Sequence, residues 1–206
     1  MNYIVFDLET TGLDPNKEQI TEIGAIKTDE NFNELGRFHS YVALDGHILT
    51  PFIKQFTGIT EKTLENAPSE FEALTKLHDF IDEDSIIVAQ YAPFDLSFIL
   101  KYSNALPKLD PKQFICTKSL TSQVVKGKLP ANLGKTCERL GIKLDNAHEA
   151  MADSVATLEL LKYRQNNNLE DIPYFNNSIS KVNENTYLPT HTKAVLDSKG
   201  NLLELR

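Results

Sequence analysis

The chain has 206 residues, of which 41% are hydrophobic and 24% charged, and its formal net charge is −8 at pH 7. Such a length and balance suit one soluble globular domain, or one domain with an appendage, and the negative charge argues against a generic polyanion binder. No apolar run approaches the roughly 20 residues that span a membrane, no secretion signal opens the chain, and Cys116 and Cys137 lie in no metal-ligand spacing, so we expect a cytoplasmic protein with reduced thiols.

The first predicted element is a buried strand at Tyr3–Phe6, an apolar and β-prone run. Asp7 and Glu9 follow at its end, two residues apart, and side chains at that spacing in a strand share one face. Further strands are predicted at 20–28 and 36–44. The first three strands should therefore form a meander.

Helical patterns begin after the third strand. Pro51 suits a first helical position and Gly58 a stop, which predicts a helix within 50–60. Ser69 suits the cap of a helix over 69–82. The remaining predicted elements are strands at 85–90 and 114–117 and helices at 94–106, 133–142 and 147–164. Strands first, then strands alternating with helices, predict an α/β fold with a mixed sheet flanked by helices.

The last helix and the end of the chain complete the expected organisation. Asn146 and Glu149 resemble a capping box at the start of that helix. Past Gln165 the sequence becomes rich in Asn and loses its periodicity, and 192–206 resembles a β-hairpin. We therefore expect a domain at 1–165 and a tail or small appendage at 166–206.

Carboxylates also stand at the tips of two later elements. Asp95 follows the strand at 85–90 and starts a helix, and Asp153 lies on the helix at 147–164. Helical spacing places Asp153 on one stripe with Ala156, Thr157 and Leu160. The small and apolar members of this stripe predict that it packs inward. An Asp near a helix start is often only a cap, and that alternative stays open for both residues.

Asp7 and Glu9 need another explanation, because two carboxylates on one face repel and are costly to bury unpaired. The segments 1–15, 85–100 and 145–160 contain neither Lys nor Arg. This composition favours a divalent metal site, although a Lys from elsewhere in the chain would also serve. Oxygen ligands favour Mg²⁺ or Mn²⁺ over zinc.

His148 precedes Asp153 by five residues. A lone His is often structural, but beside carboxylate-held metals it is a candidate general base for a water molecule. A local excess of basic residues lies between Thr117 and Lys143, made up of Lys118, Lys126, Lys128, Lys135, Arg139 and Lys143, against Glu138 alone. This basic stretch is either a solvated face or a contact for the nucleic-acid strand.

Three segments resemble the motifs of the DEDDh, or DnaQ-like, family of 3′–5′ exonucleases: FDLETTGLD, VAQYAPFDLSFIL and HEAMADSVATLELL. The signature positions match, in order, Asp7, Glu9, Asp95, His148 and Asp153. FTGIT and LGKTCERLGI resemble further family segments, so the resemblance spans residues 1 to 164. The sister group, which has a Tyr four residues before the final Asp, does not fit because that position is Glu149.

The resemblance implies a ribonuclease-H-like fold with a mixed five-stranded sheet. It implies hydrolysis of DNA or RNA from the 3′ end with release of nucleoside 5′-monophosphates. By this resemblance Asp7 bridges two metals, Mg²⁺ or Mn²⁺, while Glu9 and Asp153 complete the first site and Asp95 supports the second. His148 would take a proton from the attacking water.

The resemblance also implies a pocket for the 3′-terminal nucleotide. Thr10, Thr11 and Leu13 would line it, and Ile59 would pack on the terminal base. For Leu13 and Ile59 a plain core role is the alternative. Where the family usually carries His-Asn, this chain has Gln90 and Tyr91, and Tyr91 offers a ring for base stacking.

The expected partner is single-stranded nucleic acid with a free 3′ end, and no membrane. A competing prediction makes the chain a proofreading or trimming subunit of a polymerase or processing complex. Residues 166–206 would be its tether, with anchors at Ile172, Tyr174, Phe175 and Ile179. A third prediction is a catalytically silent relative that binds nucleic-acid ends.

Overall fold

Three antiparallel strands begin the fold in the computed structural model, which describes residues 1–111, 113–118, 132–166, 175–176, 194–196 and 202–205. β1 (Tyr3–Thr10) pairs with β2 (Ile20–Thr28), which pairs with β3 (Glu34–Tyr41). The predicted meander is confirmed. β1 runs farther than predicted, so that Asp7 and Glu9 lie within the strand.

Parallel strands complete the sheet on the other side of β1. β4 (Ile86–Ala89) pairs with β1, and β5 (Gln113–Cys116) pairs with β4, both in parallel. The order β3-β2-β1-β4-β5 confirms the mixed five-stranded sheet. β6 (Phe175–Asn176) adds a short antiparallel strand at the β5 edge. It was not predicted, because it lies in the Asn-rich segment without strand periodicity.

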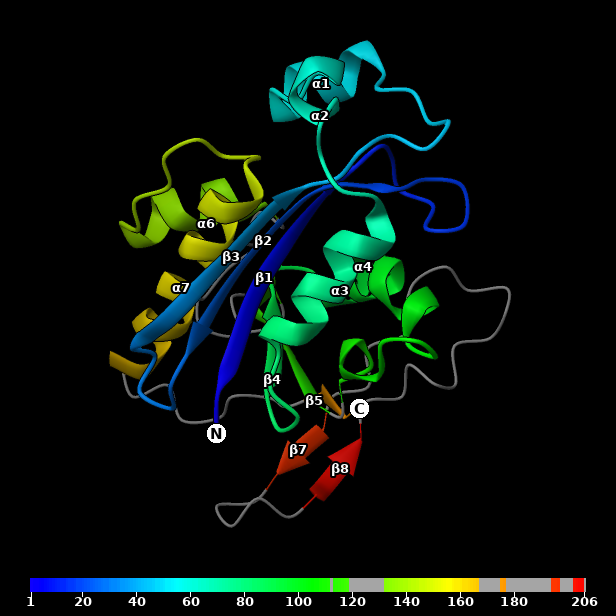
Figure 1. Cartoon of the computed structure of the whole chain (residues 1–206). Helices are drawn as coiled ribbons and strands as arrows, with labels where there is room; N and C mark the ends of the chain where they lie inside the picture. The colour runs from blue at the N-terminus through cyan, green and yellow to red at the C-terminus, as the bar shows by residue number, and fades with distance from the viewer. Residues whose placement is uncertain (112, 119–131, 167–174, 177–193, 197–201, 206) are drawn as a thin grey trace.

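Helices cover both faces of the sheet (Figure 1). Their bounds are α1 (Pro51–Thr57), α2 (Glu61–Leu64), α3 (Glu70–Phe80), α4 (Ala92–Ile99), α6 (Leu133–Leu140) and α7 (Ala150–Asn166). Short 3₁₀ turns follow α4 at Leu100–Tyr102 and Pro107–Leu109, so the helix predicted over 94–106 is shorter than expected. Pro51 starts α1 and Gly58, at φ 74°, ends it, and Ser69 caps α3 with Glu72, as predicted.

The start of α7 differs from the prediction. The helix begins at Ala150, and Asn146 lies in the preceding turn with φ 56°. Its carboxamide donates to Glu149 Oε2 at 3.4 Å, but it does not cap the helix. The Ala150 N–H donates instead to the Glu22 carboxylate on β2, at 3.2 Å. The predicted capping box is wrong because a distant strand supplies the acceptor.

The alternation of β1 side chains separates two apolar layers. Ile4 and Phe6 belong to the layer that contains Leu74 of α3 and Leu96 of α4. Tyr3 and Val5 belong to the opposite layer, with Leu158 and Leu161 of α7. A third, small cluster of Leu49, Ile59 and Leu64 lies at α1 and α2. The layered arrangement fixes which side chains of β1 face α7.

Residues 166–206 are described only in short pieces. β7 (Ala194–Leu196) pairs antiparallel with β8 (Leu202–Leu205). Ile172, Tyr174 and Ile179 lie outside the described residues, and the division of the chain near residue 165 stays a prediction.

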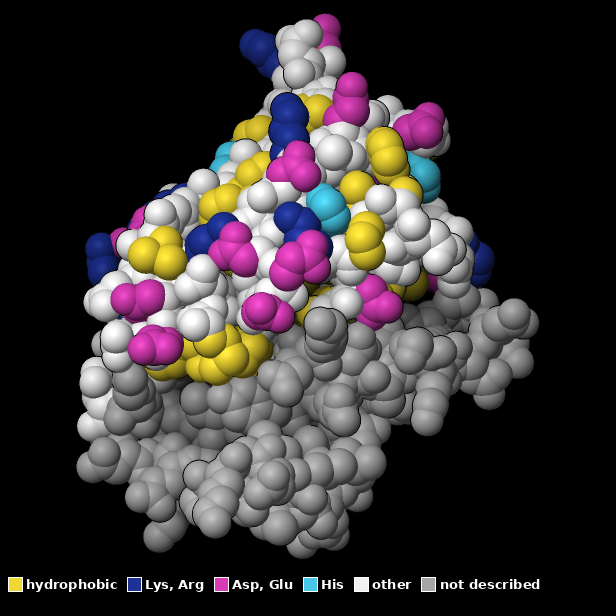
Figure 2. Space-filling view, turned by 60° about the horizontal axis from the view of Figure 1, so that its bottom comes forward, with side chains coloured by type: hydrophobic (Ala, Val, Ile, Leu, Met, Phe, Trp, Pro, Cys, Tyr) yellow, Lys and Arg dark blue, Asp and Glu magenta, His cyan; other side chains and the backbone are white. Residues whose placement is uncertain are grey.

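The described surface and helices bear on the possible partners. Over the described part of the face in Figure 2, Lys and Arg side chains lie among Asp and Glu side chains, so no field of one sign dominates it. None of the helices that the structure describes combines the length and apolar character needed to cross a membrane. Cys116 and Cys137, the two cysteines of the sequence, are both buried and are not joined in a disulfide.

Candidate active site

One face of β1 changes from apolar to acidic along the strand. Tyr3 and Val5 pack in the layer that α7 covers, and Asp7 and Glu9 follow them on the same face. The antiparallel register places Glu9 opposite Glu22 of β2. Glu9 and Glu22 are both buried. The strand therefore carries its two carboxylates under the beginning of α7.

Asp95 reaches β1 because β4 is short. β4 pairs with β1 only as far as Val5, and the chain then turns into α4. The N–H of Leu8 donates to Asp95 Oδ1 at 3.2 Å. Asp95 is 3% exposed. Asp95 thus lies beyond the carboxyl end of β4 and beside the later part of β1. The carboxyl ends of parallel strands are the usual place for a site in such sheets.

The close approach of α7 to β2 positions Asp153. A Cβ atom at Gly24 would collide with the backbone of Ala150 and Met151, so only glycine permits this contact. Ser154 Oγ donates to the Gly24 carbonyl at 2.9 Å and holds the helix there. The stripe of Asp153, Ala156, Thr157 and Leu160 is buried, which confirms its predicted inward packing.

His148 lies in the turn before α7, with φ 72°. Its backbone N–H donates to Asp153 Oδ2 at 3.4 Å. One donor atom from each of Glu9, His148 and Asp153 lies within 4.8 Å of the other two. The His148 ring stacks on Phe56, with ring centroids 3.6 Å apart. A backbone turn thus brings the ring to the carboxylates, and an aromatic ring covers it.

The carboxylates raise one another's pKa in addition to the effect of burial. The pKa of Asp7 is raised well above its usual range. Burial is the largest cause, followed by the charges of Asp95, Asp153, Glu9 and Glu22. Burial raises the pKa of Glu9 to about 9, and Asp153, Glu22 and Asp95 contribute. Burial raises the pKa of Asp95 to about 8 and that of Asp153 to about 6. Within the described part of the chain, no Lys or Arg forms an ion pair with any of these four groups.

The donor set fits a divalent cation. Asp153 Oδ1 is buried and has no hydrogen-bond partner among the described residues. The carboxylates offer the oxygen ligands that Mg²⁺ and Mn²⁺ prefer. A cation would also favour the charged forms that burial and mutual repulsion oppose.

The stability of the metal-free protein should fall as the pH rises from 7 to 9. The folded chain retains protons on Glu9 and Asp95, whose pKa values are about 9 and 8, whereas the unfolded chain has lost them. Because the folded state binds more protons, its free energy of unfolding decreases through this window. One pKa unit is worth ~1.4 kcal/mol, or about 3–6 °C in Tm for a protein of this size.

Thermal melts in a chelator and in Mg²⁺ or Mn²⁺ measure this effect. We expect the metal to raise Tm more at pH 9 than at pH 7. His148 does not oppose the effect, because burial lowers its pKa from the usual 6.5 and it titrates below this window. A chelator-treated protein whose Tm is constant or rises from pH 7 to 9 would contradict the expectation.

The residues predicted to bind the terminal nucleotide lie in different surroundings. Thr10 Oγ1 donates to the Gly12 carbonyl at 2.6 Å, and Thr11 Oγ1 donates to Glu18, so both hydroxyls serve the loop itself. Leu13 is 81% exposed. Ile59 is 3% exposed in the cluster with Leu49 and Leu64, which fits the core alternative.

The predicted basic stretch is only partly described. Lys126 and Lys128 lie outside the described residues. Lys118 Nζ lies 4.0 Å from the centroid of the Tyr91 ring. Lys143 pairs with Asp145. Whether this stretch contacts a nucleic-acid strand stays a prediction.

Two residues of the site were not predicted from the sequence. Glu22 accepts the Ala150 N–H and approaches His39 Nε2 at 2.7 Å. Phe56 covers His148. The register of the β1–β2 pair would have placed Glu22 opposite Glu9. No local sequence pattern identifies Phe56, because its partner, His148, lies far away in the sequence.

Comparisons with known proteins agree with this geometry. A family model described as Exonuclease, RNase_T, matches residues 4–161. A protein named DNA polymerase III PolC-type, from Clostridium perfringens, is 30% identical over 200 residues, which are 94% of this chain and 14% of that protein. A protein named 3′-5′ exonuclease DinG, from Staphylococcus saprophyticus, is 34% identical over 160 residues, or 77% of this chain and 17% of that protein.

A solved structure shows the same fold. E. coli exonuclease I in complex with a dT13 oligonucleotide matches with a TM-score of 0.67 at 21% identity, over 80% of this chain and 41% of the other. At that identity the likeness concerns the ribonuclease-H-like fold alone. The chain spans a small part of the curated relatives just described, 14% and 17% of their lengths.

Proposed function

Because this chain belongs to the RNase_T exonuclease family, we propose that it is a metal-dependent 3′–5′ exonuclease. It would remove nucleotides one at a time from the 3′ end of DNA or RNA and release nucleoside 5′-monophosphates. The observation that carries the proposal is the cluster of four carboxylates, with raised pKa values and no basic partner in the described chain, beside His148. The polarity is supported by the relative named 3′-5′ exonuclease.

The carboxylates would hold two divalent cations, Mg²⁺ or Mn²⁺. Asp7 is the proposed ligand of both cations, as the family resemblance implies, and Asp95, Asp153 and Glu9 lie close enough to raise its pKa. Glu9 and Asp153 complete one site, and Asp95 supports the other. Cations held there would stabilise the attacking and leaving oxygens and offset the negative charge of the phosphate.

His148 is the proposed general base. One ring nitrogen takes a proton from the water that attacks the scissile phosphorus. The bond from phosphorus to the 3′ oxygen breaks, which leaves a 3′-hydroxyl on the strand and a 5′-phosphate on the released nucleotide. Burial lowers the pKa of His148, which favours the neutral, proton-accepting ring near pH 7.

Contacts to the terminal nucleotide are assigned to residues around the first motif. Leu13 offers an open apolar side chain for packing. Lys118 and Tyr91 place a cation beside an aromatic ring, a combination suited to a phosphate and a base. Thr10, Thr11 and Ile59 keep their predicted roles as proposals.

A second function within the same chemistry is that of a proofreading or trimming subunit. The similarity to a protein named DNA polymerase III PolC-type supports it. Residues 166–206 would then be the tether to a polymerase or a processing complex. Deleting this segment should abolish capture of the partner and leave 3′-end shortening intact.

Incubation of 5′-labelled DNA and RNA oligonucleotides with Mg²⁺ or Mn²⁺ tests the proposal. We expect a ladder of products that shorten from the 3′ end, and no products in a chelator. A 3′-labelled strand should release its label as a mononucleotide at once. If neither metal supports cutting of either nucleic acid, the chain is a silent binder of nucleic-acid ends.

A further inference from the structure

Helix α1 presents two aromatic rings to solvent. Phe52 is 67% exposed and Phe56 is 43% exposed. They lie four residues apart, which places them on one side of the helix. Their rings stack with centroids 5.5 Å apart and planes inclined by 19°. Figure 1 shows α1 and α2 projecting past the end of the sheet, beyond the carboxyl end of β1.

The two rings lead into the active site. Phe56 also stacks on His148, with centroids 3.6 Å apart and planes inclined by 30°. Phe52, Phe56 and His148 thus form one continuous stack, which we call the aromatic ladder. Its inner end lies beside Glu9 and Asp153, and its outer end is open to solvent.

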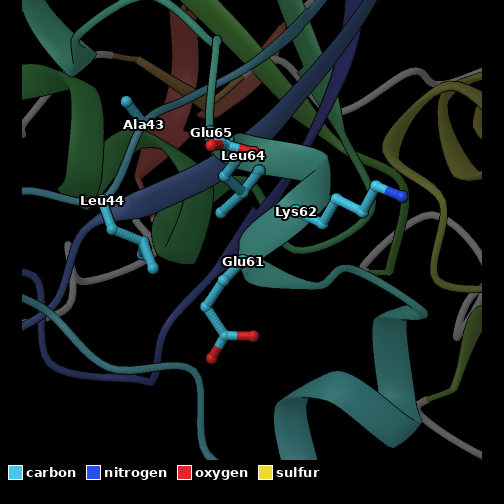
Figure 3. Close-up of a pocket in the computed structure, with 6 residues that line it drawn as sticks. All are labelled: Ala43, Leu44, Glu61, Lys62, Leu64 and Glu65. Carbon is cyan, nitrogen blue, oxygen red and sulfur yellow. The ribbon is translucent and has the colours of Figure 1, made fainter.

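Charges near the ladder favour base stacking over phosphate binding. Lys54, on the same helix, is paired with Glu61. The hollow beside α2, ≈ 440 Å³ in volume, is lined by Glu61 and Glu65 as well as Lys62. Figure 3 shows the side chains of Glu61 and Lys62 pointing apart. Two carboxylates there disfavour a phosphate backbone in the hollow.

We propose that Phe52 and Phe56 form a stacking platform for unpaired bases of the nucleic-acid strand whose 3′ end enters the site. The inference rests on the proposed exonuclease function and deepens it. Every base has a planar face that an aromatic ring can stack on, so the platform tolerates any sequence. Bases held in a duplex cannot use it. The ladder therefore selects single-stranded substrates.

The test compares nucleic-acid binding by the Phe52→Leu variant with binding by the protein that retains Phe52. Leu keeps an apolar side chain but removes the planar face. Binding is measured by fluorescence anisotropy in Mg²⁺, in an Asp95→Asn background that is expected not to cut the strand. The probes are an oligothymidylate and a strand of equal length with abasic sites throughout. We expect Phe52→Leu to raise the Kd for oligothymidylate about tenfold, the loss of one base stack, and to leave the abasic strand unchanged.

Two further variants sharpen the comparison. Phe52→Trp should restore or tighten binding, because it returns a larger ring. Phe71→Leu is the matched control, since Phe71 is 49% exposed on α3 and its ring contacts Tyr102, which is not part of the ladder. It should leave both Kd values unchanged.

Four outcomes would overturn the platform. Phe52→Leu could bind both strands as tightly as the unsubstituted chain, or weaken both equally, or change the oligomeric state in sedimentation, which would make the rings a protein contact. Absence of any oligonucleotide binding would overturn it as well. Because binding is measured without cutting, failure of the platform is separable from failure of the exonuclease reaction.

Discussion

Asp7→Asn is expected to lower the rate of 3′-end shortening by more than about 100-fold. Replacing a residue that only hydrogen-bonds to a metal ligand commonly lowers metal affinity or activity about 10- to 100-fold. Asp7 is itself the proposed ligand of both cations, so a larger loss is expected. Asn keeps the size of the side chain and removes its charge. The rate is measured on a 5′-labelled oligonucleotide in Mg²⁺.

The same variant should remain folded in a chelator and melt at a higher temperature. Burial and four neighbouring carboxylates raise the pKa of Asp7, so its charge opposes folding when no cation is bound. Removing about 1 kcal/mol of this repulsion would raise Tm by about 2–4 °C. Asp84→Asn, in the exposed turn before β4, is the matched control. Full activity of Asp7→Asn would exclude the cluster as the catalytic site.

His148→Ala is expected to lower kcat by about 100- to 10,000-fold, the usual contribution of a general base. The substitution also decides between two roles. The His148 ring lies close enough to Glu9 and Asp153 to ligate a metal. A base can be removed without loss of metal binding, so Mg²⁺ or Mn²⁺ should still raise the Tm of the variant. Loss of that rise would make His148 a ligand.

A control separates the loss of His148 from general damage. His78→Ala removes a histidine from α3 that approaches Asp79 rather than a site residue. It should leave kcat unchanged. Because the His148 ring is one end of the aromatic ladder, KM should be measured together with kcat for both variants.

Local patterns predicted most of the fold because each depends on nearby residues. The bounds of β2 match the predicted 20–28, and the end of α1 follows from Gly58. The start of α7 could not be predicted in this way. The N–H of Ala150, the first residue of the helix, donates to the carboxylate of Glu22, which lies 128 residues away in the sequence. A cap supplied by tertiary structure leaves no local signal.

The residues of the site, like the elements of the fold, could be predicted only in part. The motifs located Asp7, Glu9, Asp95, His148 and Asp153, and the structure brings donor atoms of Glu9, His148 and Asp153 together. The roles of all five stay predictions until tested. Phe56 escaped prediction because its position depends on the path of the chain between β3 and α3, which no short pattern specifies.

The contact between Glu22 and Ala150 joins an early strand to a helix that is synthesised much later. Three of the carboxylates, on β1 and α4, belong to the first half of the chain, whereas Asp153 and His148 arrive with α7. During synthesis, a chain that has not yet reached α7 has neither the fourth carboxylate nor the base. A nascent or truncated chain of this kind should therefore cut nothing, and we expect activity only after α7 has been synthesised and has packed against β2.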